Sequence, residues 1–146
     1  MGKKQKLIDL LNNALEDEHQ AYVQYLSHAE IVTGKDCEPI IARLKEIASD
    51  EAKHQAMFRE MIGDYLFGVP SMGISKTTPA KDLDEILKVN LKAEMGAVDK
   101  YAMILEELKN AKDELKYEYA KLEHEVRHIM MEEQEHIAEL KKLMGQ

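Results

Sequence analysis

The sequence has 146 residues, of which 45% are hydrophobic and 33% charged, with 7 Gly, 3 Pro and no Trp. This length suits a single domain over residues 1–146, and the composition favours long helices over a turn-rich β fold or a disordered chain. The formal charge of −8 predicts repulsion of nucleic acid and of anionic membrane surfaces, so cations are the more natural partners.

The cellular setting is predicted from what the chain lacks. Cys37 is the single cysteine, so no intramolecular disulfide or CxxC metal site is expected, and we interpret it as an ordinary loop thiol. The first residues are basic and polar without an apolar stretch behind them, and no segment approaches the roughly 18 apolar residues of a membrane span. We therefore expect a soluble, cytoplasmic protein.

Apolar residues recur at spacings of three, four and seven along four long segments, which is the pattern of one buried helix face. The predicted helices cover about residues 5–32, 39–66, 82–110 and 114–144. Residues 67–81 contain Gly, Pro, Ser and Thr and are predicted to form a long connection. Two short turns and one long crossover predict an all-α four-helix bundle, made of two antiparallel helix pairs.

Each predicted helix carries one glutamate in the middle of its apolar stripe: Glu18, Glu51, Glu94 and Glu133. When residues are placed about 100° apart around each helix, the apolar positions fall within about 40° of that glutamate. Positions 18 and 51 are also equally far from the first turn, as are 94 and 133 from the last. Four buried, unpaired carboxylates would each cost several kcal/mol, so we expect bound cations to neutralise them.

Two of these glutamates are followed three residues later by histidine, as Glu51–His54 and Glu133–His136. Residues at i and i+3 share a helix face, so each pair offers an oxygen and a nitrogen to one ion. One Glu from each of two helices and ExxH from the other two is the ligand set of di-iron and di-manganese carboxylate bundles. The sequence therefore predicts a two-metal centre, with iron, manganese or a mixed pair left open.

The remaining histidines are not predicted to bind metal. Glu125 and His128 form another ExxH pair, but both lie off the apolar arc, so we assign them a solvated or flanking role. His19, His28 and His124 also fall outside the buried faces and are predicted to lie at the surface.

Two tyrosines lie at the same distance in sequence from two of the glutamates. Tyr25 follows Glu18 by seven residues, and Tyr101 follows Glu94 by seven. Each ring is expected two turns along the same face, where it would hydrogen-bond a ligand or donate an electron to the site, or simply fill the core. The matching halves suggest an internal duplication.

Four stretches of the chain resemble the ferritin-like superfamily, and bacterioferritin in particular. They are Glu18-His-Gln-Ala-Tyr-Val-Gln-Tyr25, Asp50-Glu51-Ala-Lys-His54, Leu91-Lys-Ala-Glu94-Met-Gly-Ala97 and Glu133-Gln-Glu-His136-Ile137. The resemblance implies that Glu18 and Glu94 are terminal ligands, that Glu51 and Glu133 bridge two metals, and that His54 and His136 bind one metal each. It also implies binding of two Fe(II) and reaction with O2 or H2O2.

The chain departs from its relatives at three points. Ala52 stands where bacterioferritin has its haem-ligating Met, so haem is not expected. The chain ends ten residues past His136, without the fifth helix of bacterioferritin cages, so a 24-subunit shell is not predicted. Rubrerythrins resemble the chain too, but they typically carry a glutamate where this sequence has Ala97, and a rubredoxin module that is not seen in this sequence.

The expected function is that of a di-iron ferroxidase, which oxidises Fe(II) with O2 or H2O2 in iron storage or detoxification. A rubrerythrin-like peroxide reductase and a non-catalytic metal-binding bundle are the alternatives. A homo-oligomer, at least a dimer, is expected because partner helices readily cover leftover apolar surface.

Overall fold

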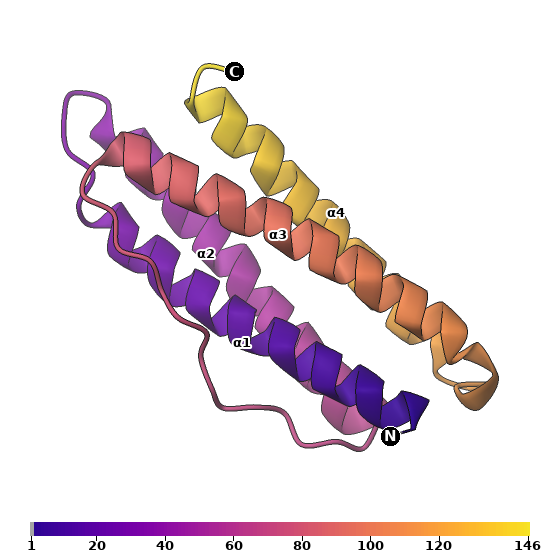
Figure 1. The fold of residues 1–146 in the computed structure, drawn as a ribbon. Helices are drawn as coiled ribbons and strands as arrows, with labels where there is room; N and C mark the ends of the chain where they lie inside the picture. Colours follow the sequence, from indigo (N-terminus) through magenta and orange to yellow (C-terminus); the bar gives the residue numbers. More distant parts are fainter. Residues whose placement is uncertain (1) are drawn as a thin grey trace.

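The computed structural model describes residues 2–146, and four long helices account for most of them. They are α1 (Lys3–Ala29), α2 (Cys37–Glu60), α3 (Leu83–Asn110) and α4 (Tyr119–Leu143). A π-helical turn, Met61–Tyr65, extends α2, and no strand occurs within residues 2–146. The predicted all-α bundle is confirmed: α1 and α2 form one antiparallel pair, α3 and α4 the other (Figure 1).

The last helix begins later than the sequence indicated. A 3₁₀ turn occupies Lys112–Glu114, and α4 starts at Tyr119 rather than near residue 114. Leu115 falls within the predicted range of this helix, but it follows the 3₁₀ turn in the connection before α4, where its side chain is buried. Burial without helical backbone explains this difference, because the turn folds Leu115 back onto the end of the core.

The crossover between the two pairs runs in an extended conformation along α1 (Figure 1). Hydrogen bonds fix it there: Ser75 N donates to Glu16 O at 3.1 Å, and Asn12 Nδ2 donates to Val69 O at 3.0 Å. At Gly68 a Cβ atom would approach the Ile8 side chain to 3.0 Å, so the close packing of the crossover requires glycine here.

His28 is buried beneath the crossover, so its predicted surface position is wrong. Its Nε2 donates to Thr78 O at 2.9 Å, and its Nδ1 accepts from Asn90 Nδ2 at 3.0 Å. Burial lowers the pKa of His28. His19 is half-buried, with its Nδ1 2.6 Å from Gly73 O, whereas His124 is exposed as expected.

The apolar core is divided into two clusters along the bundle. One contains Leu11, Phe58 and Ile104, and the other contains Ile47, Ile86 and Leu140. In every helix the residues of the two clusters lie on opposite sides of the inward-facing glutamate, so a polar layer separates them. No helix within residues 2–146 is long and apolar enough to cross a membrane.

Candidate metal centre

The polar layer contains the six residues that the sequence predicted as metal ligands, and all of them are buried. They are Glu18 from α1, Glu51 and His54 from α2, Glu94 from α3, and Glu133 and His136 from α4. None is more than 2% exposed. The helical spacing explains this convergence, because each residue lies on its helix's apolar stripe and the four stripes face one another.

The six side chains form two overlapping groups of four. One group is Glu18, Glu51, His54 and Glu133, and the other is Glu51, Glu94, Glu133 and His136. Within each group, one ligand atom from every residue lies within 4.8 Å of the others. Glu51 and Glu133 belong to both groups, so the arrangement suits two neighbouring cations with two shared carboxylates.

Both histidines turn Nδ1 toward the centre. His54 Nδ1 lies 3.3 Å from Glu133 Oε1 and 3.6 Å from Glu18 Oε2. His136 Nδ1 lies 3.2 Å from Glu94 Oε2 and 3.3 Å from Glu133 Oε1. Each ring therefore offers one nitrogen to a cation among the carboxylates.

Two acidic residues that sequence analysis did not nominate face the other side of these rings. His136 Nε2 donates to Asp50 Oδ2 at 2.9 Å, and His54 Nε2 lies 3.4 Å from Glu132 Oε1. A carboxylate behind a ligand histidine fixes the ring orientation and raises its basicity. The signal was present in the sequence, because each residue directly precedes the glutamate of an ExxH pair.

Several buried atoms of the centre have no hydrogen-bond partner. They are Glu18 Oε2, Glu51 Oε1, Glu133 Oε1 and both ring nitrogens of His54, which lie at ion-pair distance from carboxylates without hydrogen-bond geometry. Leaving a buried polar group unsatisfied costs about 1–3 kcal/mol. These oxygen and nitrogen donors fit divalent transition metals, whose binding would satisfy them.

The protonation of the centre reflects its burial and crowding. Burial, with the charge of Glu133, raises the pKa of Glu94 to about 8, and burial together with Glu18 raises the pKa of Glu51 well above its usual range. Burial acts against the charged form of Glu133 too, but the nearby imidazoles of His136 and His54 hold its pKa below the usual value.

The two histidines hold their protons in the metal-free protein. Burial alone would lower their pKa values, but the close carboxylates of Glu133, Glu18 and Glu94 raise the pKa of His54 to about 10 and that of His136 to about 11. In the metal-free protein, the protons on His54 and His136 thus provide positive charge that bound cations would provide instead.

Both tyrosines reach the centre, but each contacts a glutamate of the opposite helix. Tyr25 Oη donates to Glu94 Oε1 at 3.1 Å, and Tyr101 Oη donates to Glu18 Oε1. Burial raises the pKa of both phenols well above the usual range, so both remain protonated donors. They orient the carboxylates that belong to only one ligand group each.

The other ExxH pair stays outside the centre, as predicted. Glu125 pairs with Lys121 at 3.1 Å, and exposed His128 contacts Glu132 Oε1 at 2.9 Å through Nε2. His128 therefore flanks the residue behind His54 without joining either group.

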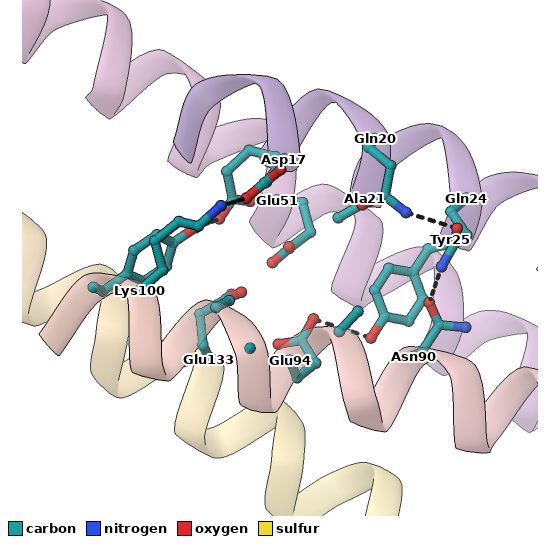
Figure 2. A pocket seen from close by; sticks show the side chains of 15 residues that line it. Asp17, Gln20, Ala21, Gln24, Tyr25, Glu51, Asn90, Glu94, Lys100 and Glu133 are labelled. Carbon is teal, nitrogen blue, oxygen red and sulfur yellow. Dashed lines mark hydrogen bonds and ion pairs between the residues drawn. The ribbon is translucent and has the colours of Figure 1, made fainter. Parts of the chain in front are cut away.

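A cleft of about 280 Å³ opens between α1 and α3 onto the four glutamates. Figure 2 shows Glu51, Glu94 and Glu133 at its floor, Asp17 and Lys100 on one side, and Gln20, Gln24 and Asn90 on the other. The carboxylates are thus buried among helices but reachable from one face of the bundle.

Comparison with known proteins places the chain among such bundles. The Ferritin-like domain family matches residues 8–146. A structure of a ferritin-like, diiron-carboxylate protein from Bacillus anthracis str. Ames has a TM-score of 0.89 at 24% identity, with 98% of each chain covered. The dodecameric thioferritin of Bacteroides fragilis, a bacterioferritin-related protein, has a TM-score of 0.81 at 27% identity, covering 97% of this chain and 86% of that one. No curated protein matches the chain.

Proposed function

Because the chain belongs to the ferritin-like domain family, we propose that it is a di-iron carboxylate oxidoreductase. As a ferroxidase, it would oxidise Fe(II) with O2 or H2O2 in iron storage or detoxification. The observation that carries the proposal is the pair of buried ligand groups sharing Glu51 and Glu133. A bundle that needed only one structural ion would not require two such groups.

Each ion has its own terminal ligands in this proposal. Glu18 and His54 would hold one Fe(II), and Glu94 and His136 the other, while Glu51 and Glu133 bridge them. Four carboxylates balance the charge of two divalent ions, and neutral imidazoles add nitrogen ligands without charge. The proposal agrees with the roles that the family resemblance implies.

The protein's own groups prepare the iron for oxidation. Two Fe(II) held by the two ligand groups would supply the two electrons that reduce one peroxide. Carboxylates stabilise the additional positive charge that develops on oxidation, and Tyr25 and Tyr101 keep Glu94 and Glu18 in position as hydrogen-bond donors. Asp50 orients His136 through Nε2.

We also propose that the chain forms a homo-oligomer, at least a dimer. The crossover exposes large apolar side chains, with Phe67, Val69 and Met72 at least 80% exposed. Contact with a second copy would bury them, and the Bacteroides fragilis relative is dodecameric. Sedimentation should show an oligomer that Met72→Glu weakens, while Lys76→Glu on the same segment does not. A monomeric parent protein would contradict the proposal.

Anaerobic titration of the metal-free protein with Fe(II), followed by exposure to O2 or H2O2, tests the function. We expect about two Fe(II) per chain and rapid appearance of diferric absorbance. Glu94→Ala should lose this reaction, whereas Glu125→Ala, which removes a carboxylate outside the centre, should retain it.

The alternatives give different results in the same experiment. Repeated turnover with excess Fe(II) supports a ferroxidase, and binding without turnover supports a metal-binding bundle. A strong preference for H2O2 together with an external electron donor supports a peroxide reductase. Weak binding, or a Glu94→Ala variant that behaves like the parent, would contradict the assignment of the centre.

A further inference from the structure

The cleft between α1 and α3 is larger than O2 or H2O2 requires (Figure 2). Its volume is about 280 Å³, whereas one water molecule has a share of about 30 Å³ in the liquid. The cleft therefore holds several such volumes beyond the two oxygen atoms of a peroxide, which is room for an alkyl group of roughly four carbons.

Small side chains keep this space open. Ala21 from α1 and Ala93, Gly96 and Ala97 from α3 line the cleft. Glycine inside a helix costs about 1 kcal/mol relative to alanine, but a Cβ atom at Gly96 would meet no atom within 4 Å. Packing therefore does not require glycine here, and a side chain longer than alanine at this lining position would have free space to extend across the cleft.

The floor and the rim differ in their polarity. The floor is acidic, because Glu18, Glu51, Glu94 and Glu133 line it. At the rim, Lys100 is already paired with Asp17. No free cation at the rim would attract an anionic substrate, and the acidic floor repels one.

On the other side of the rim, the polar side chains hydrogen-bond to one another. Gln20 Nε2 donates to Gln24 Oε1 at 2.7 Å, and Gln24 Nε2 donates to Asn90 Oδ1 at 3.0 Å. A molecule entering the cleft thus passes between neutral or paired groups and meets small apolar side chains. This environment suits an uncharged molecule with one short apolar end.

We propose that the cleft admits neutral alkyl hydroperoxides as oxidants, with the alkyl group against Ala21, Ala93 and Ala97 and the peroxide toward the glutamates. This inference rests on the proposed function, because two bound Fe(II) are the reductant. The reaction is ROOH + 2 Fe(II) + 2 H⁺ → ROH + H2O + 2 Fe(III). The O–O bond breaks, each iron loses one electron, and solvent provides the two protons.

Stopped-flow oxidation of protein loaded anaerobically with two Fe(II) per chain tests the activity. We expect tert-butyl hydroperoxide to react within about tenfold of the H2O2 rate. Gly96→Leu should slow tert-butyl hydroperoxide at least tenfold and H2O2 less than twofold. Gly96→Ala is the matched control and should change neither rate, because its Cβ meets open space.

Each result has a definite meaning. Reaction with H2O2 but not with tert-butyl hydroperoxide would overturn the inference and leave the proposed function standing, as would equal slowing of both oxidants by Gly96→Leu. Absence of reaction with H2O2 and with O2 as well would instead refute the proposed function. Iron mixed with the Glu94→Ala variant gives the background rate of unbound Fe(II).

A binding measurement without iron provides an independent test. Metal-free protein with labelled alanine methyl groups is titrated with tert-butyl alcohol, the product of the reaction. The methyl signals of Ala21, Ala93 and Ala97 should shift, exposed Ala138 should not, and Gly96→Leu should abolish the shifts. Absence of shifts, or equal shifts at Ala138, would overturn the inference.

Discussion

Replacing Glu94 by glutamine tests whether the metal-free protein holds its carboxylates at the expense of stability. Burial and the charge of Glu133 raise the pKa of Glu94 from 4.5 to about 8. Between these values the unfolded chain releases the proton while the folded protein keeps it, so stability falls as the pH rises. At pH 7 the penalty is about 1.36 × (7 − 4.5), or roughly 3 kcal/mol.

Glutamine cannot ionise, so it removes this penalty while keeping an oxygen that accepts the hydrogen bond from Tyr25. His136 would lose one carboxylate but retain Glu133 beside it. We therefore expect the metal-free variant to gain about 1–3 kcal/mol in free energy of unfolding at pH 7. Added Mn(II) should reverse the order, because the parent protein has the complete ligand set.

Urea unfolding in the presence of a chelator measures the effect. Glu125→Gln, which alters a surface pair with Lys121, should change stability by less than about 0.5 kcal/mol. At pH 4 the gain from the Glu94 substitution should vanish, because the carboxyl is then mostly neutral in both states. A metal-free variant less stable than the parent at pH 7 would refute the reasoning and show that the ion pair of Glu94 with His136 outweighs desolvation.

Three further predictions concern the groups around the centre. Asp50→Asn should weaken metal affinity about 10–100-fold by loosening His136, as measured by competition with a chelating dye. Tyr25→Phe should cost about 1–3 kcal/mol in urea unfolding of the metal-free protein, because Glu94 Oε1 loses its donor. Loading two Mn(II) at pH 7 should release about two or more protons, since the two ligand histidines have pKa values of about 10 and 11. Affinity should therefore rise with pH, and calorimetry in buffers of different ionisation enthalpy counts the protons; release of none would contradict the assignment.

The bundle and the six residues of its polar layer were predictable because local periodicity determines both. A glutamate in an apolar stripe must face the core wherever the helix packs, and the i, i+3 spacing keeps Glu51 with His54 on one face. Equal distance from a turn then places Glu18 level with Glu51. None of these arguments requires knowledge of contacts between the two hairpins.

Features that depend on packing between distant segments were missed. His28 lies off the buried face of its own helix, but the crossover covers it through Thr78. Asp50 and Glu132 also lie beside the predicted faces, and only the docking of α2 against α4 brings them to the histidines. Placing residues around a helix at about 100° intervals compares each residue only with others on the same helix. It therefore cannot identify a carboxylate that contacts a histidine of the opposite hairpin.

The exchange of groups between hairpins explains why the centre tolerates so much buried charge. Each ligand group takes three residues from one hairpin and a bridging glutamate, Glu133 or Glu51, from the other. Asp50 likewise supports His136, and Glu132 faces His54, each across the hairpin boundary. Metal binding therefore joins two halves whose buried carboxylates must otherwise take up protons when the halves dock, and the free energy of binding adds directly to the stability of the bundle.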